Sequence, residues 1–217
     1  MRVIDLEAWP RRRHFEFFRG FDNPHFGLCA DVDVTALRRI VQERDLPLTV
    51  ALTYVLSRAA NEIPEFRQRI RGETIVEHEV VHPSLIVLTD DELFGFCYLP
   101  YVEDFAAFAA GATEAMRRAR AHPRLEDEPG RDDLLFMSPV PWVSFTAVLH
   151  PVPVRPVDSV PRIAWGKLAP SGKRLRMPVA LQVHHGLLDG LHLGRYFSAV
   201  QGLLDEPTFL DGRHRGR

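Results

Sequence analysis

The stretch 177–204, MPVALQVHHGLLDGLHLGRYFSAVQGLL, constrains the fold of this chain more than any other part of the sequence. At its start, Val179, Leu181 and Val183 alternate with other residues, which is the period-two pattern of a strand with one buried face. Beyond the strand, apolar residues recur every three or four positions, and Asp189 stands where a helix N-cap would stand. The stretch therefore predicts a buried strand, a tight turn and an amphipathic helix.

The predicted turn carries two adjacent histidines. If the alternation continues past the strand, His185 lies on the apolar side and His184 on the other side. His185 is followed by Asp189 and Gly190 in the spacing H-x-x-x-D-G. Neutral imidazole is the side chain best suited to take a proton near pH 7, so His185 is a candidate general base. The spacing also occurs by chance, and adjacent histidines are often part of the packed end of a strand.

A metal site is the alternative interpretation of the same residues. His184, His185, Asp189 and His192 are all possible zinc ligands. Neighbouring residues of a strand point to opposite faces, however, and no Cys or Glu completes the set. We therefore expect no metal here.

Composition narrows the class of protein. The 217 residues are 46% apolar and 26% charged with a net charge of −2, so charge gives no argument for nucleic acid or an anionic membrane. The two cysteines, Cys29 and Cys97, lie in apolar runs and are expected to be core residues, not a disulfide framework. No apolar signal segment or membrane-length apolar run is present, so we expect a cytoplasmic protein.

Periodicity and turn residues predict the remaining elements. We expect strands at 25–33, 73–81, 85–89, 93–99, 134–140, 143–149 and 162–168, and helices at 11–21, 34–45, 48–63 and 102–121. Asp90, Asp91 and Glu92 mark a hairpin turn, residues 122–133 and 151–161 are expected to be loops, and the tail after Pro207 is expected to be frayed. The strand at 162–168 is expected to pair with the strand before His184 through a turn at 169–173. This mixture favours an α/β fold, a mixed sheet covered by helices, in one domain over residues 1–217.

Six short motifs, spread along the chain and in order, make this sequence resemble the chloramphenicol acetyltransferase family over nearly its whole length. They are W-x-R-x-x-H-F at 9–15, P-E-F-R at 64–67, V-H-P at 81–83, P-W-V-S-F-T at 141–146, G-K at 166–167 and P-V-A-L-Q-V-H-H-x-x-x-D-G-x-H at 178–192. Each motif is weak alone, but together they are specific. The resemblance implies a homotrimer in which an acceptor alcohol and acetyl-CoA meet in a channel at each subunit interface.

The resemblance also implies roles for single residues. His185 matches the family's general base, held in its tautomer by its own main-chain carbonyl, and Ser144 matches the serine that hydrogen-bonds the oxyanion. Asp189 matches a residue that forms an ion pair with an arginine aligned with Arg11, a role compatible with a helix cap. Lys167 aligns with a lysine near the coenzyme, so Lys167 and Ser144 are expected on the coenzyme side. Without the resemblance, Ser144 would be an ordinary strand serine and Lys167 a solvated charge.

The acceptor pocket is the part of the match in which this sequence departs from the family pattern. Four phenylalanines fall where the family lines this pocket, although each is equally well explained as core packing: Phe17, Phe18, Phe26 and Phe94. Three departures concern the acceptor. Ala164 stands where the family commonly has a threonine, Leu168 stands where an aromatic residue is common, and the charged run 126–133 replaces a segment that is often aromatic.

The sequence therefore predicts acetyl transfer from acetyl-CoA to a hydroxyl of chloramphenicol, with antibiotic resistance as the consequence. A different small hydroxylated acceptor is the first alternative. A dihydrolipoyl acyltransferase core shares the turn, but this chain has no room for a lipoyl domain and a mobile linker. A trimer that binds a drug-like ligand without turnover would need neither His185 nor Ser144.

Overall fold

The computed structural model describes residues 1–126, 130–153 and 156–211. The large sheet consists of β2 (His25–Asp33), β5 (His82–Leu88), β6 (Phe94–Tyr98), β7 (Leu134–Val140), β8 (Arg162–Gly166), β9 (Ala169–Ser171) and β10 (Arg174–His184). Its strand order is β2-β10-β8-β7-β5-β6, and β9 pairs with β10 outside this path. The β5–β7 and β7–β8 pairs are parallel and the other pairs are antiparallel, so the expected mixed sheet is confirmed.

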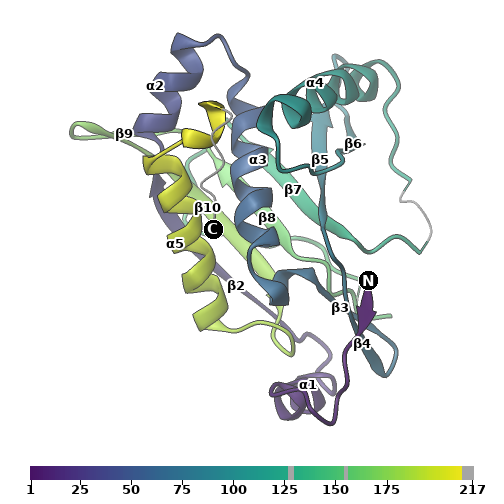
Figure 1. Cartoon of the computed structure of the whole chain (residues 1–217). Coiled ribbons are helices and arrows are strands. Elements are labelled where there is room, and N and C mark those ends of the chain that lie inside the picture. Colours follow the sequence, from purple (N-terminus) through teal and green to yellow (C-terminus); the bar gives the residue numbers. More distant parts are fainter. Residues whose placement is uncertain (127–129, 154–155, 212–217) are drawn as a thin grey trace.

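The helices cover one face of this sheet. They are α1 (Arg12–Phe18), α2 (Thr35–Glu43), α3 (Leu48–Asn61), α4 (Phe105–Ala121) and α5 (Gly190–Asp205), with short 3-10 helices η1 (Pro64–Arg67) and η2 (Thr208–Asp211). Figure 1 shows α2, α3, α4 and α5 in front of the sheet and α1 below it, near the end of β10. The α3 helix is buried on almost all sides because it packs between α4 and α5. The main core therefore lies between these four helices and the large sheet.

The strand β10 is an interior strand of the large sheet, next to the edge strand β2. It pairs with β2 on one side and with β8 on the other, and every residue of 177–184 is buried. Val179, Leu181 and Val183 belong to the helix-side core, as the alternation predicts. A Cβ at Gly27 of β2 would lie 2.9 Å from the carbonyl oxygen of Leu181, so this glycine permits the close approach of the two strands.

Residues 143–149 do not form the predicted strand. After β7 the chain leaves the sheet at Pro141 and continues as an irregular segment. Trp142, Val143 and Leu149 are 64%, 54% and 87% exposed. The apolar pattern predicted a strand, but β5 and β8 already pair with the two edges of β7, and the segment pairs with no strand in the described part of the chain.

Part of the predicted strand at 73–81 forms the middle strand of a smaller three-stranded sheet, whose order is β1-β4-β3. Its strands are β1 (Arg2–Val3), β3 (Gln68–Arg71) and β4 (Thr74–Glu77), and Gly72 takes a positive φ in the turn between β3 and β4. The sequence analysis missed β3, because its residues QRIR show no apolar alternation. The predicted hairpin of β5 and β6 and the pairing of β8 with β10 are confirmed.

The remaining predictions concern loops and ends. Residues 122–126 and 130–133 lie outside helices and strands, as expected for 122–133, but residues 127–129 of the charged run lie outside the described part of the chain. The predicted loop 151–161 is likewise irregular where the structure describes it, without residues 154–155. The predicted frayed tail instead includes η2 up to Asp211, and residues 212–217 lie outside the described residues. Within the described residues, no helix combines the length and apolarity needed to cross a bilayer.

Candidate active site

The turn between β10 and α5 is held by backbone hydrogen bonds and by two buried leucines. The backbone N–H of His185 donates to the carbonyl of Pro24 over 2.8 Å, and those of Leu187 and Leu188 donate to the carbonyl of His184 over 3.0 and 3.1 Å. Both leucines are completely buried. The position of His185 is therefore set by the end of a central strand and by the core beneath it.

The imidazole ring of His185 lies between two of the predicted phenylalanines. The ring centroid of Phe18 is 4.1 Å away and nearly parallel, and that of Phe26 is 4.3 Å away. The His185 Nδ1 atom lies 3.2 Å from the carbonyl oxygen of Leu188. Because a carbonyl can only accept, Nδ1 carries the proton and Nε2 keeps its lone pair for a hydroxyl. The carbonyl is that of Leu188, whereas the resemblance implied that of His185 itself.

The predicted ion pair between Arg11 and Asp189 is present beside this turn. The Arg11 Nη1 atom lies 2.6 Å from Asp189 Oδ2, and Arg11 Nη2 donates to the carbonyl of His185 over 3.4 Å. Asp189 also caps α5, because its Oδ1 accepts from the N–H of Leu191 over 3.0 Å. Burial opposes its charge, but the hydrogen bond from Arg11 and the charge of His192 hold the pKa of Asp189 well below its usual range.

His184 lies on the other side of the strand from His185. Its ring meets His25 edge to face at 5.4 Å, and its Nδ1 accepts from the N–H of Gly186 over 3.1 Å. The side chain is almost fully buried, and desolvation lowers the pKa of His184 to about 4. The four candidate metal ligands do not converge, and among the described residues no three potential ligands form a metal-binding group.

The structure places Ser144 and Lys167 together but far from His185. Both are exposed, and the backbone N–H of Lys167 donates to the carbonyl of Val143 over 2.9 Å. Trp165, two residues before Lys167, pairs with Val179 of β10, six residues before His185. At roughly 3.3 Å per strand residue, the level of Val179 lies about 20 Å along β10 from His185, so Lys167 and the neighbouring Ser144 lie toward the other end of this strand.

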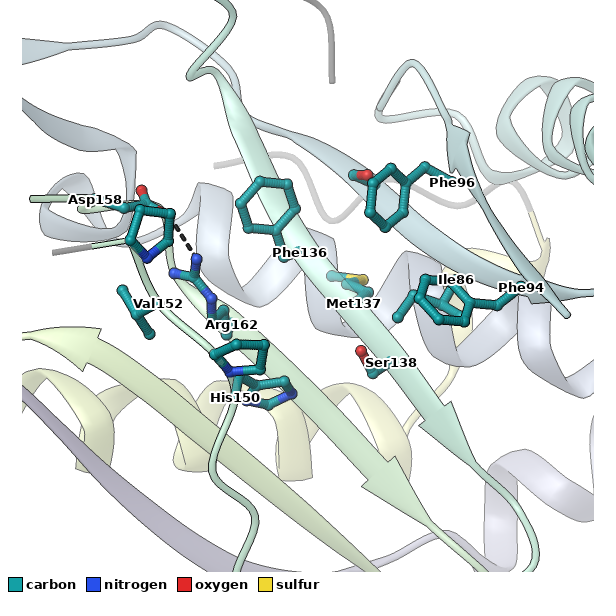
Figure 2. Close-up of a pocket in the computed structure, with 13 residues that line it drawn as sticks. Ile86, Phe94, Phe96, Phe136, Met137, Ser138, His150, Val152, Asp158 and Arg162 are labelled. Atoms are coloured by element: carbon teal, nitrogen blue, oxygen red, sulfur yellow. Dashed lines mark hydrogen bonds and ion pairs between the residues drawn. The ribbon is translucent and has the colours of Figure 1, made fainter. Parts of the chain in front are cut away.

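A cavity of about 520 Å³ opens on the sheet face opposite the main helices. Figure 2 shows Ile86, Phe94 and Phe96 gathered on one side of it and Arg162 with His150 on the other, with Phe136 between them. The four phenylalanines named from the sequence are thus divided between two places. Phe18 and Phe26 contact His185, Phe17 is 63% exposed and packs on Phe18, and Phe94 lines the cavity.

The sequence analysis missed the polar end of this cavity. Arg162 is 5% exposed, its Nη2 lies 2.5 Å from Asp158 Oδ2, and its guanidinium lies 5.2 Å from the ring centroid of Phe136. Desolvation lowers the pKa of His150, which lines the same end. Arg162 alternates with the core residue Ile163 along β8, and this alternation is the sequence signal that could have placed it on the cavity side.

Two of the departures from the family pattern lie near this region. Ala164 is fully buried and pairs with Ser138, a cavity residue. Leu168 is partly buried against the main core. Ala164 therefore lies beside the cavity and Leu168 beside the core, and neither residue belongs to the turn of His185.

Comparisons with known proteins agree with this architecture. The sequence pattern described as "Chloramphenicol acetyltransferase" matches residues 1–201. The chain is 28% identical to chloramphenicol acetyltransferase 2 of Haemophilus influenzae and to a chloramphenicol acetyltransferase of Bacillus pumilus, covering 96% and 91% of those proteins and 93% and 92% of this chain.

Solved structures also resemble this chain over most of its length. A chloramphenicol acetyltransferase superposes with a TM-score of 0.83 at 28% identity, over 94% of this chain and 99% of that chain. A truncated catalytic core of the 2-oxoacid dehydrogenase multienzyme complex from Thermoplasma acidophilum reaches 0.67 at 16% identity, over 95% of this chain and 99% of that chain, and shows the fold alone. With most of its length matched by the family pattern, the chain belongs to the chloramphenicol acetyltransferase family, a family of acetyl-CoA-dependent O-acetyltransferases.

Proposed function

We propose that this protein transfers the acetyl group of acetyl-CoA to a hydroxyl of chloramphenicol, with His185 as general base. The observation that carries this proposal is the bond between His185 Nδ1 and the carbonyl of Leu188, because it leaves Nε2 as the proton acceptor. The named relatives of similar length support the choice of acceptor. Antibiotic inactivation would be the biological consequence.

The reaction needs a base and an oxyanion donor. Nε2 of His185 takes the proton of the acceptor hydroxyl while the hydroxyl oxygen attacks the thioester carbonyl. The hydroxyl of Ser144 donates to the oxyanion of the tetrahedral intermediate, an interaction whose loss commonly costs about 2.7–4 kcal/mol of barrier stabilisation. When the intermediate collapses, the C–S bond breaks and the coenzyme A thiolate takes the proton from His185. No covalent acyl-enzyme is required.

The separation of His185 from Ser144 along β10 supports a site shared between two copies of the chain. We propose that each 1–217 chain acts as one domain of a homotrimer, in which His185 of one subunit reaches Ser144 of the next. The exposed Trp142, Val143 and Leu149 support this assembly, because apolar side chains exposed to this extent are typical of subunit interfaces.

The two substrates would approach this site from opposite sides. Lys167, beside Ser144, would attract the phosphates of coenzyme A. The cavity lined by Phe94, Phe96 and Phe136 would hold the aromatic ring of the acceptor, with Phe17, Phe18 and Phe26 around the base. Arg11 and Asp189 would act on the turn rather than on the substrate.

The test is release of coenzyme A thiol when purified protein meets acetyl-CoA and chloramphenicol. We expect acceptor-dependent thiol release, and a loss of nearly all of it, at least about 100-fold, in His185→Ala. His122→Ala, an exposed histidine at the end of α4, is the matched control and should keep the wild-type rate. A wild-type rate equal to that of His185→Ala would reject the assignment.

A second acceptor is favoured by one observation. The buried Arg162–Asp158 pair gives the cavity a polar end, which suits an acceptor with a hydrogen-bonding group far from its reactive hydroxyl. A panel of hydroxylated small molecules in the same assay separates this candidate from chloramphenicol. Calorimetry that detects drug binding but no binding of coenzyme A would instead favour a protein that binds without turnover.

A further inference from the structure

A charged cluster lies behind the turn of His185. Its centre is His192, which is 5% exposed and belongs to the first turn of α5. His192 Nδ1 lies 2.8 Å from Asp189 Oδ1, and His192 Nε2 lies 3.5 Å from Glu65 Oε1 of η1. The motifs at 64–67 and 178–192 contain these residues, and the reaction described above gives neither Glu65 nor His192 a role.

The two carboxylates beside His192 favour a proton on each ring nitrogen. A carboxylate oxygen only accepts hydrogen bonds, and each of the two nitrogens faces one. A neutral ring would turn a lone pair toward one of the carboxylates and repel it. The same carboxylates raise the pKa of His192 above its usual value, with the hydrogen bond to Glu65 as the largest cause and burial opposing it.

The structure also indicates what the neutral ring would do. The backbone nitrogen of Asp189 lies 3.2 Å from His192 Nδ1, so its N–H can donate there only when Nδ1 is unprotonated. The charged ring therefore donates to the side chain of Asp189, whereas a neutral ring protonated on Nε2 accepts from the Asp189 backbone N–H and turns a lone pair toward the carboxylate. These are two alternative sets of contacts for the residue that caps α5.

The cluster connects to the base through alternating charges. Glu65, His192, Asp189 and Arg11 follow one another as negative, positive, negative and positive groups. Arg11 then donates to the carbonyl of His185 over 3.4 Å. These are the charged groups of η1, α5, the turn and the start of α1 that face the cluster.

We propose that His192 is a positioning residue whose imidazolium form, held by Glu65, fixes Asp189 and Arg11 and thereby the turn that carries His185. This inference rests on the proposed function, because it assumes that His185 is the base. His192 would then be a titratable group that influences the site without contacting either substrate. Displacing a reacting group by even about 1 Å can cost up to about 100-fold in rate, so a loosened turn would be visible in kcat.

The sign of the pH effect follows from the protonation state. Below the raised pKa of His192 the ring is charged and the turn is braced, and as the pH rises through that pKa the brace is lost. The kcat profile should therefore fall on its alkaline side. Removing the charge of Glu65 takes away the largest cause of the raised pKa of His192, so this alkaline fall should move to lower pH.

The experiment measures kcat against pH for the wild type, Glu65→Gln and His192→Gln, with Glu62→Gln as the matched control. Glu62 is three residues from Glu65 and pairs with Arg58 at the surface. We expect the alkaline fall to shift to lower pH in Glu65→Gln, to vanish in His192→Gln with kcat about tenfold below the wild type throughout, and to stay in place in Glu62→Gln. A purely structural role would lower all rates without moving the profile.

Proton NMR of the histidine rings gives a readout that does not depend on activity. His192 should titrate above 6.5 in the wild type and lower in Glu65→Gln, and Glu65→Asp should restore part of the difference. An alkaline limb that stays in place in Glu65→Gln, or a His192 that titrates below 6.5, would overturn the inference. Full activity in His185→Ala would reject the proposed function instead and would leave the NMR result intact.

Discussion

At the residue scale, three histidines within nine positions have three different environments. His184 is buried against His25, His185 lies between two aromatic rings with one carbonyl contact, and His192 lies between two carboxylates. From sequence spacing alone, all three are possible zinc ligands. Their chemistry differs because burial and neighbouring charges, and not the residue type, decide which form of imidazole is stable.

We expect the buried His184 to make the folded protein less stable in acid. Burial lowers the pKa of His184 to about 4, so the unfolded chain binds a proton there before the native chain does. His184 therefore has no such effect on stability above about pH 6.5. As the pH falls from 6.5 to 4, it lowers the free energy of unfolding by up to about 3 kcal/mol. His184→Asn can still accept from Gly186 and should show a flatter stability profile in this range by urea unfolding. Parallel profiles for the two proteins would contradict the prediction.

At the element scale, the pairing of β2 with β10 depends on a close backbone approach. The turn between β10 and α5 carries the candidate base, and β2 supplies Phe26 to its ring. Gly27, the residue after Phe26, has no room for a Cβ because the Leu181 carbonyl oxygen would lie 2.9 Å away. The contact of Phe26 with His185 therefore depends on the close pairing of β2 with β10.

We expect Gly27→Ala to destabilise the protein by about 1–3 kcal/mol, because the strands must separate to admit the methyl group. Gly194→Ala is the matched substitution on α5, where nothing lies within 4 Å of the added Cβ. It should stabilise the helix by about 0.5–1 kcal/mol. Urea unfolding of both variants measures the two changes in the free energy of unfolding. An unchanged free energy of unfolding in Gly27→Ala would show that β2 can move to admit the methyl group.

At the scale of the whole molecule, one chain holds two halves of the candidate site. The base and its two phenylalanines lie at the end of β10, while Ser144, Lys167 and the cavity lie elsewhere on the sheet. Val143 and Leu149 of the segment 143–149, which was expected to be a strand, and the preceding Trp142 are exposed. Assembly of copies would bury these side chains and unite the halves.

Leu149→Asp should therefore break the assembly and the activity together, because it places a charge on the most exposed of these apolar side chains. Light scattering after gel filtration should give a trimer for the wild type and a monomer for the variant. Circular dichroism should show that the variant is folded. Leu125→Asp, also at an exposed leucine, is the control and should stay trimeric. A monomeric wild type with full activity would refute the proposal that the site is shared between subunits.

The sequence by itself determined the local elements and the identity of the key turn. Alternation gave β10, the three- and four-residue repeat gave α5, and H-x-x-x-D-G located His185 and Asp189 between them, because these patterns are properties of neighbouring residues. Only the tertiary structure decided that 143–149 is not a strand, that Phe94 is separated from Phe18, and that His192 is held by Glu65. Each of these depends on contacts between residues far apart in the chain, and local periodicity carries no information about which distant partner is present.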